Sequence, residues 1–140
     1  VSHLVSFKRQ SSAIQPLCEN AGTTSEPEWR ANVTAGWTNG PWGANASARY
    51  VGETEDIIGG RVNGGCEPET RLQSVDSYTE FGLNAFWDFH PSSRLTFGVN
   101  NLTDETPPFS EQASGGWPWY DQALYNNFGR EFYIQLRTDF

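Results

Sequence analysis

The chain has 140 residues and a net charge of -8, and this acidic balance excludes the basic stripe expected of a nucleic-acid-binding protein. Its aromatic content of 14%, with six Trp, exceeds that of disordered chains, and no apolar run approaches the roughly 18 residues of a transmembrane helix. Because no Met occurs, we expect residues 1–140 to be a processed product or a piece of a longer protein.

Alternation of apolar and polar residues with a period of two, the pattern of β-strands, recurs along the chain. In chain order the alternating segments are Val1–Lys8, Trp29–Trp37, Ala44–Tyr50, Glu80–Phe89, Arg94–Asn100 and Glu131–Phe140. The first of these has the weakest pattern. Helical periodicity is nearly absent, so the sequence predicts an all-β protein of about six antiparallel strands.

The connections between these segments alternate strictly between short and long. The short ones, residues 38–43 and 90–93, are tight turns built from turn-forming residues. The long ones, Arg9–Glu28, Gly52–Val75 and Thr103–Gly129, are rich in Gly, Pro, Ser and Glu. Unstructured loops of about 20 residues are uncommon in small domains. Outer-membrane barrels, in contrast, combine short periplasmic turns with long extracellular loops, and the alternation therefore favours a transmembrane β-barrel segment.

The distribution of charge agrees with this interpretation. The three long connections hold twelve acidic residues and three Arg, whereas the strands and turns hold five acidic and six basic residues. Each strand has one aromatic and aliphatic face without charge and one polar face. In a membrane barrel the uncharged face contacts lipid and the polar face lines the lumen, whereas in a soluble sandwich the uncharged face packs on a second sheet.

Aromatic residues lie near both ends of the predicted strands. The rings at the turn ends are Trp37, Trp42, Trp87, Phe89 and Phe140, and those at the loop ends are Trp29, Tyr50, Phe81 and Phe132. Two bands of rings are typical of the two membrane–water interfaces, although rings that fill the core of a sandwich would give a similar pattern.

The two cysteines, Cys18 and Cys66, have no zinc-site spacing and lie in loop-like stretches. They are either two unpaired thiols or one disulfide, and a disulfide would imply an oxidising compartment such as the periplasm or the cell surface.

No catalytic or cofactor-binding motif is present. The two histidines are His3 and His90, and the second lies in a His-Pro turn. Glu80 and Asp88 share a face but are about 27 Å apart along an extended strand, too far for a paired acid and base. The acidic run at residues 53–56 lacks the spacing of a calcium loop and is interpreted as solvated loop acids. We therefore predict a protein that is not an enzyme and has no catalytic residues, metal or cofactor.

The best candidate for ligand binding is the aromatic cluster Trp117, Trp119 and Tyr120 in the last long loop. Exposed rings beside Pro and Gly can stack on sugars or on aromatic ligands, and Pro lowers the entropic cost of ordering the loop. The alternative is a loop that packs its own rings over the rim of the barrel.

Two motifs in the C-terminal third resemble the barrel of TonB-dependent outer-membrane receptors. Residues 94–104, RLTFGVNNLTD, resemble the penultimate strand of this family with its Gly-Val-x-Asn-Leu-x-Asp run. Residues 125–140 resemble the last strand, with its Gly-Arg entry at Gly129-Arg130 and a terminal Phe140. Pro27–Arg30 and Ala48–Gly52 are similar to strands further upstream in the same barrels.

This resemblance implies that residues 1–140 are the C-terminal part of a barrel of about 22 strands, with the plug domain and the earlier strands absent. It implies uptake of a scarce nutrient, such as a ferric siderophore or another small substrate, across the outer membrane of a Gram-negative bacterium. The implied partners are outer-membrane lipid, the rest of the barrel and plug, and TonB through the absent N-terminal parts. The transported small molecule is not specified, and no nucleic acid is involved.

The resemblance also implies roles for individual residues. If the Phe140 end is periplasmic, all three long loops are extracellular, so Cys18 and Cys66 lie in consecutive loops joined by one hairpin, within reach of a disulfide. Phe140, with Phe132, Ile134 and Leu136 at alternate positions, resembles the signal read by the barrel-assembly machinery. The competing interpretation is a secreted, soluble β-sandwich that binds carbohydrate through Trp117 and Trp119.

Overall fold

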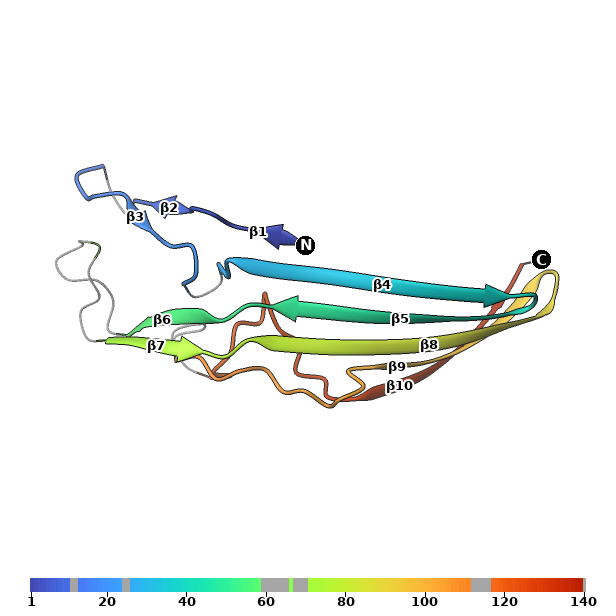
Figure 1. Cartoon of the computed structure of the whole chain (residues 1–140). Coiled ribbons are helices and arrows are strands. Elements are labelled where there is room, and N and C mark those ends of the chain that lie inside the picture. The colour runs from blue at the N-terminus through green and yellow to red at the C-terminus, as the bar shows by residue number, and fades with distance from the viewer. Residues whose placement is uncertain (11–12, 24–25, 59–65, 67–70, 112–116, 140) are drawn as a thin grey trace. The chain divides into compact units, whose positions relative to one another are not determined.

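β-Strands are the only regular secondary structure in the computed structural model, which describes residues 1–10, 13–23, 26–58, 66, 71–111 and 117–139 (Figure 1). The strands are β1 (Ser2–His3), β2 (Lys8–Arg9), β3 (Cys18–Glu19), β4 (Trp29–Asn39), β5 (Trp42–Val51), β6 (Thr54–Ile58), β7 (Arg71–Val75), β8 (Tyr78–His90), β9 (Ser93–Asn100) and β10 (Glu131–Thr138). Within these described ranges, no helix is long and apolar enough to cross a membrane.

Six strands form the main sheet, in the order β1-β4-β5-β8-β9-β10, and β2–β3 and β6–β7 form two small hairpins. The pairings of β1 with β4, of β8 with β9 and of β9 with β10 are antiparallel. Among the described residues, the sheet has two edges, β1 and β10, which do not pair with each other. The predicted all-β, antiparallel fold is therefore confirmed, as an open portion of a barrel.

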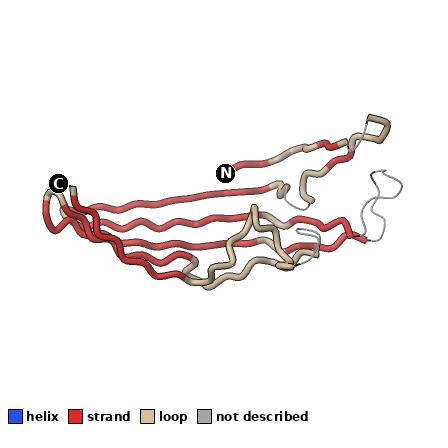
Figure 2. Tube along the Cα trace, turned by 180° about the vertical axis from the view of Figure 1, so that it is seen from behind, coloured by secondary structure: helices blue, strands red, loops and turns tan. Residues whose placement is uncertain are grey.

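The chain divides into two units, each of which is described by itself. The loop unit comprises Val1–Arg30, Tyr50–Tyr78 and Pro107–Asn127. The strand unit comprises Ala31–Arg49, Thr79–Thr106 and Phe128–Phe140. Figure 2 shows that the strand unit consists mainly of strands and tight turns, whereas much of the loop unit has no regular structure.

Two tight turns connect the long strands, as the sequence predicts. Gly40, with φ of 58°, joins β4 to β5 in a left-handed conformation that glycine adopts without steric cost. The turn between β8 and β9 is held by the backbone N–H of Ser92, which donates to His90 Nδ1 at 3.2 Å. These turns set long antiparallel strands side by side in the strand unit.

The predicted strand Val1–Lys8 is wrong in its extent. Only Ser2 and His3 pair with β4, where the His3 ring stacks on Trp29 at 3.9 Å. Further along, Glu19 accepts hydrogen bonds from the Ser6 hydroxyl and the Phe7 N–H, and Lys8 pairs with Glu19 across the β2–β3 hairpin. These contacts with Glu19 therefore hold residues 6–8 at the β2–β3 hairpin, and these residues do not pair with β4.

The prediction that Arg9–Glu28 and Gly52–Val75 are unstructured connections is also wrong. The first contains β3, and the second contains β6 and β7, paired from Thr54↔Val75 to Ile58↔Arg71. Val75 and Ile57 are both buried, so the hairpin has an apolar anchor. The sequence pattern that predicts this hairpin is weak, because acidic residues lie beside Ile57 and Val75.

The buried core lies in the loop unit. Val51, Tyr78, Leu124 and Tyr125 form one apolar cluster, in which the two tyrosine rings meet edge to face at 5.3 Å. Among the described residues of the strand unit, Val99 is the one buried hydrophobic side chain. The long strands therefore do not enclose a core of their own, in contrast to a soluble sandwich.

Candidate functional site

The strand unit has one face without charge, here called the uncharged face. Along β8 the exposed residues are Phe81, Leu83, Ala85, Trp87 and Phe89, and they alternate with half-covered Glu80, Gly82, Asn84, Phe86 and Asp88. The register continues the uncharged face across three strands, since Ala85 and Ile134 both pair with Phe97 of β9. Phe97 is 50% exposed and Ile134 is 71% exposed. Such a continuous apolar surface is the type that contacts lipid or a protein partner.

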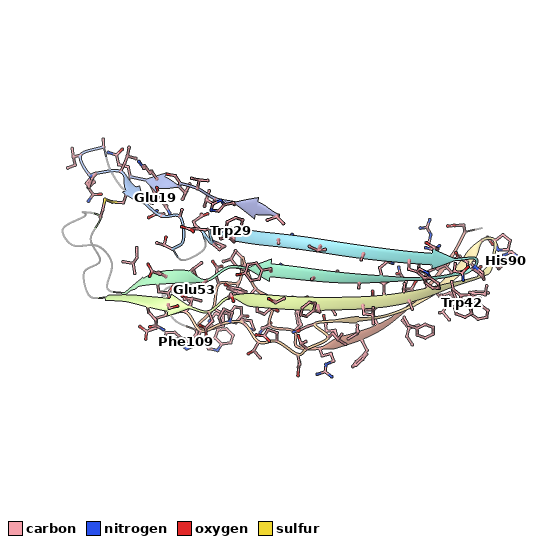
Figure 3. The ribbon with its side chains drawn as sticks, in the orientation of Figure 1. Glu19, Trp29, Trp42, Glu53, His90 and Phe109 are labelled. Atoms are coloured by element: carbon pink, nitrogen blue, oxygen red, sulfur yellow. A yellow bond between two sulfur atoms is a disulfide. The ribbon has the colours of Figure 1, made fainter. Side chains whose placement is uncertain are left out.

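Tryptophan rings gather at the turn end of this face. Trp42, labelled in Figure 3, stacks on Trp87 with the ring centroids 5.0 Å apart and the planes 4° from parallel. Trp87 also contacts Phe89. Trp37 is exposed as well. This arrangement resembles one of the two aromatic belts expected at membrane–water interfaces.

The opposite face carries polar residues, and several of its charges are paired. Arg94 donates two hydrogen bonds to the Asp88 carboxylate, at 2.6 and 2.8 Å, and its guanidinium also lies 3.9 Å from the centroid of the Phe86 ring. The amide of Asn45 donates to Asn84 at 3.0 Å, and Arg49 lies 3.9 Å from Glu80. Fixed charges and amides on this face suit a water-filled or plugged lumen.

A polar depression of about 280 Å³ lies at the turn end of the same unit. It is lined by Asp88, His90, Pro91, Ser92, Ser93, Arg94, Arg137 and Asp139. His90 lies at this end of the sheet in Figure 3, and its Nδ1 is 3.0 Å from the Ser92 hydroxyl. The pairs Arg94–Asp88 and Arg137–Asp139 balance the charge of the depression, which gives it no clear preference for a charged ligand.

The two motifs that carry the family resemblance are joined in the structure. Asn101, directly after β9, has φ of 50° and exchanges two hydrogen bonds of 2.8 Å with the backbone of Glu105. Asp104 accepts a hydrogen bond of 2.8 Å from the backbone N–H of Arg130, just before β10 begins. A Cβ at Gly129 would lie 2.7 Å from the same carboxylate. The Asn-Leu-x-Asp run therefore positions the Gly-Arg entry of the last strand.

The predicted ligand-binding rings lie in the loop unit. Trp117 is 85% exposed and Trp119 is 44% exposed, and Trp119 stacks on Phe109 with the centroids 5.9 Å apart. Tyr120, in contrast, is half-buried and packs against the core cluster that contains Tyr78 and Tyr125. The structure thus separates the two tryptophans, which reach the surface, from the tyrosine that anchors their loop.

Sequence reasoning did not identify Phe109, Ser110 or Asp56 as part of this site. The backbone N–H of Ser110 donates to the Trp119 carbonyl at 2.8 Å, and its hydroxyl donates to Asp56 Oδ1 at 3.0 Å. Asp56 is fully buried. Its place in an acidic run predicts a solvated carboxylate. That interpretation is wrong for Asp56, because this side chain is buried and is bound by Ser110 of the last long loop.

The structure joins Cys18 to Cys66 by a disulfide, with the Cα atoms 5.2 Å apart. Beside it, Glu19 receives hydrogen bonds from the Ser6 hydroxyl and from the backbone N–H groups of Phe7, Ala21 and Asn20. These donors stabilise the ionised carboxylate and lower the pKa of Glu19 from 4.5 to about 2. The bridge and the carboxylate together fasten the β2–β3 hairpin within the loop unit.

The proposed assembly residues lie on the last strand. Phe132, Ile134 and Leu136 are exposed by 77%, 71% and 64%, all on the uncharged face of β10. Phe140 lies outside the described residues.

Comparison with known proteins identifies the family. A family model described as TonB dependent receptor-like, beta-barrel matches residues 19–102, more than half of the chain. Comparison with curated proteins and with solved structures gave no match. Members of the matched family are receptors and transporters of the Gram-negative outer membrane, and they are not enzymes. The exposed uncharged face, the polar opposite face and this match agree, and the chain belongs to the TonB-dependent receptor-like β-barrel family.

Proposed function

We propose that this chain is the C-terminal barrel segment of a receptor that takes up a scarce nutrient, such as a ferric siderophore, by TonB-dependent transport. The strongest support is the alternation along β8, where uncharged exposed residues alternate with half-covered ones that include Glu80, Asn84 and Asp88. Large exposed rings such as Phe81 and Phe89 are costly in water, and lipid removes that cost.

The segment would provide part of the barrel wall and the loops that face the outside. Its proposed partners are outer-membrane lipid on the uncharged face, and the remaining barrel strands at the two edges of the sheet. One edge is formed by β1 and by the part of β4 that β1 does not cover, and the other is formed by β10. A plug inside the barrel would contact the polar face, and TonB would act through parts upstream of this segment. The barrel-assembly machinery would read the last strand through Phe132, Ile134, Leu136 and Phe140.

The proposed ligand-facing element is the loop at residues 107–127. Trp117 and Trp119 would contact the transported molecule, and Tyr120 would hold their loop against the core. The contact between Phe109 and Trp119 supports this assignment, because a stacked pair that remains 53% and 44% exposed offers a prearranged surface.

Cysteine labelling tests the proposed orientation in the receptor that carries this segment. Gln122→Cys introduces a thiol into the exposed part of the last loop, and Pro41→Cys introduces one into the β4–β5 turn. An impermeant maleimide should label Gln122→Cys on intact cells, and should label Pro41→Cys after the outer membrane is permeabilised. Cys18 and Cys66 are silent in this assay while they are bridged. The opposite labelling pattern would contradict the proposed orientation.

Transport is tested separately. Deletion of the receptor gene and depletion of TonB should abolish the same high-affinity uptake, measured with a panel of radiolabelled ferric siderophores and other scarce nutrients. If receptor deletion leaves every uptake rate unchanged, the transport proposal is wrong even where the labelling pattern agrees with a barrel.

A further inference from the structure

We propose that Phe109, Trp117 and Trp119, here called the aromatic patch, form a subsite for an uncharged sugar ring, so that the substrate is a neutral oligosaccharide or carries one. This inference rests on the proposed function, because it assigns the substrate class of the same loop. It differs from the soluble carbohydrate-binding module considered above, since the patch would serve a membrane receptor.

The first argument is the shape and exposure of the patch. Trp117 is 85% exposed, and the stacked rings of Phe109 and Trp119 are 53% and 44% exposed. The two rings stack with their centroids 5.9 Å apart and their planes 22° from parallel, and both stay partly exposed, so each presents a flat aromatic surface to a ligand (Figure 3, Phe109 labelled). The C–H groups on the face of a pyranose ring pack well on such flat aromatic surfaces, because the contact buries apolar area and leaves the ring hydroxyls at the rim.

The second argument is that hydrogen bonds within the loop unit hold the patch in place. The Trp119 carbonyl accepts a hydrogen bond from Ser110, whose hydroxyl is in turn fixed to the fully buried Asp56. Trp119 has φ of 65°, a conformation that is rare for a residue with a bulky side chain. Such outliers persist where the surrounding structure enforces them, and they occur often at ligand-binding sites. A patch that is ordered before binding loses less entropy when the ligand arrives.

The third argument concerns charge. The loop from Thr103 to Gly129 contains no Lys or Arg, so nothing in it complements an anionic ligand such as a ferric tricatecholate. Glu111, two residues from Phe109, is half-buried. Asp56 and Asp121 are already engaged, because Asp56 accepts a hydrogen bond from Ser110 and Asp121 accepts one from the N–H of Ala123 at 2.8 Å. Both carboxylates are buried, at 0% and 7% exposure, so neither faces a cationic ligand. The absence of Lys and Arg from the loop, together with the burial of these two carboxylates, favours an uncharged ring as the ligand.

The test uses the purified receptor that carries this segment, in detergent, with neutral hexasaccharides of glucose, xylose, mannose and N-acetylglucosamine as probes. A chitosan hexamer provides a cationic match to the N-acetylglucosamine probe, and a ferric tricatecholate provides an anionic ligand. We expect at least one neutral hexasaccharide to bind, with an affinity that changes little between low and high salt, because screening does not affect an uncharged ligand.

Variants locate the binding in the patch. Trp117→Ala and Trp119→Ala should each weaken binding about five- to tenfold, and Trp117→Phe should restore most of the loss. Trp37→Ala is the matched control, since Trp37 is 58% exposed but lies on β4, and it should leave the affinity unchanged. The amount of heat-modifiable barrel in each preparation corrects for misfolded protein.

Several results would overturn the sugar subsite. These are binding of none of the neutral hexasaccharides, binding that both Trp→Ala variants leave unchanged, and a preference for the tricatecholate or the chitosan hexamer. Preference for a flat, uncharged aromatic compound over every hexasaccharide would overturn it too. Each of these results leaves the transport proposal standing if uptake still depends on the receptor and on TonB, so the two failures are distinguishable.

Discussion

The carboxylate of Asp104 accepts a hydrogen bond of 2.8 Å from the backbone N–H of Arg130 and so ties the end of the penultimate strand to the start of the last one. The two residues are 26 positions apart, separated by the whole last long loop. Gly129 allows this contact, since a Cβ there would lie 2.7 Å from the Asp104 carboxylate. The loop therefore leaves and returns to the sheet through one fixed junction.

This junction gives a prediction for a double-mutant cycle. Asp104→Ala and Gly129→Ala should each destabilise the barrel by about 1 kcal/mol, because each removes the same hydrogen bond. The double variant should cost little more than either single variant, since the two changes share one interaction. Denaturant titration of the receptor measures the three free energies, and additive losses would show that Asp104 and Gly129 act independently.

The buried hydrogen bond between Ser110 and Asp56 should control the order of the aromatic loop. Asp56→Ala leaves the Ser110 hydroxyl without this acceptor inside the loop unit, and we expect a loss of about 1–3 kcal/mol in local stability. Amide hydrogen exchange of Phe109, Ser110 and Glu111 should become faster. Glu55→Gln is the matched control, because the neighbouring Glu55 is exposed and should leave exchange unchanged. Equal exchange in both variants would contradict the proposed support of the patch.

The disulfide between Cys18 and Cys66 closes a loop over a sequence separation of 48 residues. Its removal in Cys18→Ser should destabilise the loop unit by about 4 kcal/mol, because the unfolded chain regains the entropy of the open loop. Limited proteolysis with and without reductant measures this effect. Reductant should increase cleavage of the wild-type loop and should have no further effect on Cys18→Ser; a wild type that reductant leaves unchanged would contradict the prediction.

The β2–β3 hairpin should open in acid. Its carboxylate, Glu19, has a pKa lowered from 4.5 to about 2, chiefly by the hydrogen bond from Ser6 and then by those from the backbone. A lowered folded-state pKa means that the ionised form stabilises the hairpin above pH 4.5, and that this contribution is lost as the pH falls through 4.5 toward about 2. Protease sensitivity of residues 1–23 measured across this range should rise accordingly.

Two variants test the cause of this acid transition. Glu19→Gln should remove most of the pH dependence between pH 4.5 and about 2, and Ser6→Ala should move the transition to higher pH because the largest stabilising hydrogen bond is absent. An unchanged profile in Glu19→Gln would assign the transition to another group.

The proposed assembly signal predicts the effect of a C-terminal deletion. Removal of Phe140 from the full-length receptor should lower its insertion into the outer membrane, because an alternating edge strand that ends in an aromatic residue is suited to capture by strand addition. Heat-modifiable barrel on a gel measures insertion, with Thr138→Ser as a control on the same strand. Equal barrel levels in the deletion and the wild type would refute this role.

The sequence by itself determined the fold class and the two faces of the sheet. Period-two alternation from Phe81 to Phe89 and from Phe132 to Leu136 predicts the face of each strand directly, because side chains in a strand point to opposite sides in turn. The tight turns at Gly40 and Pro91 were equally evident, since turn chemistry depends on local residue type.

Only the tertiary structure decided what the long connections do. Three features of these connections come from contacts between separate parts of the chain. They are the pairing of β6 with β7, the burial of Asp56 beneath Ser110, and the stacking of Phe109 on Trp119. No local periodicity predicts such contacts, because they depend on which loops meet and on which polar groups lose water there. A run of acids such as Glu53–Asp56 therefore appears solvated in the sequence, although the fold buries one of its members and leaves its neighbour exposed.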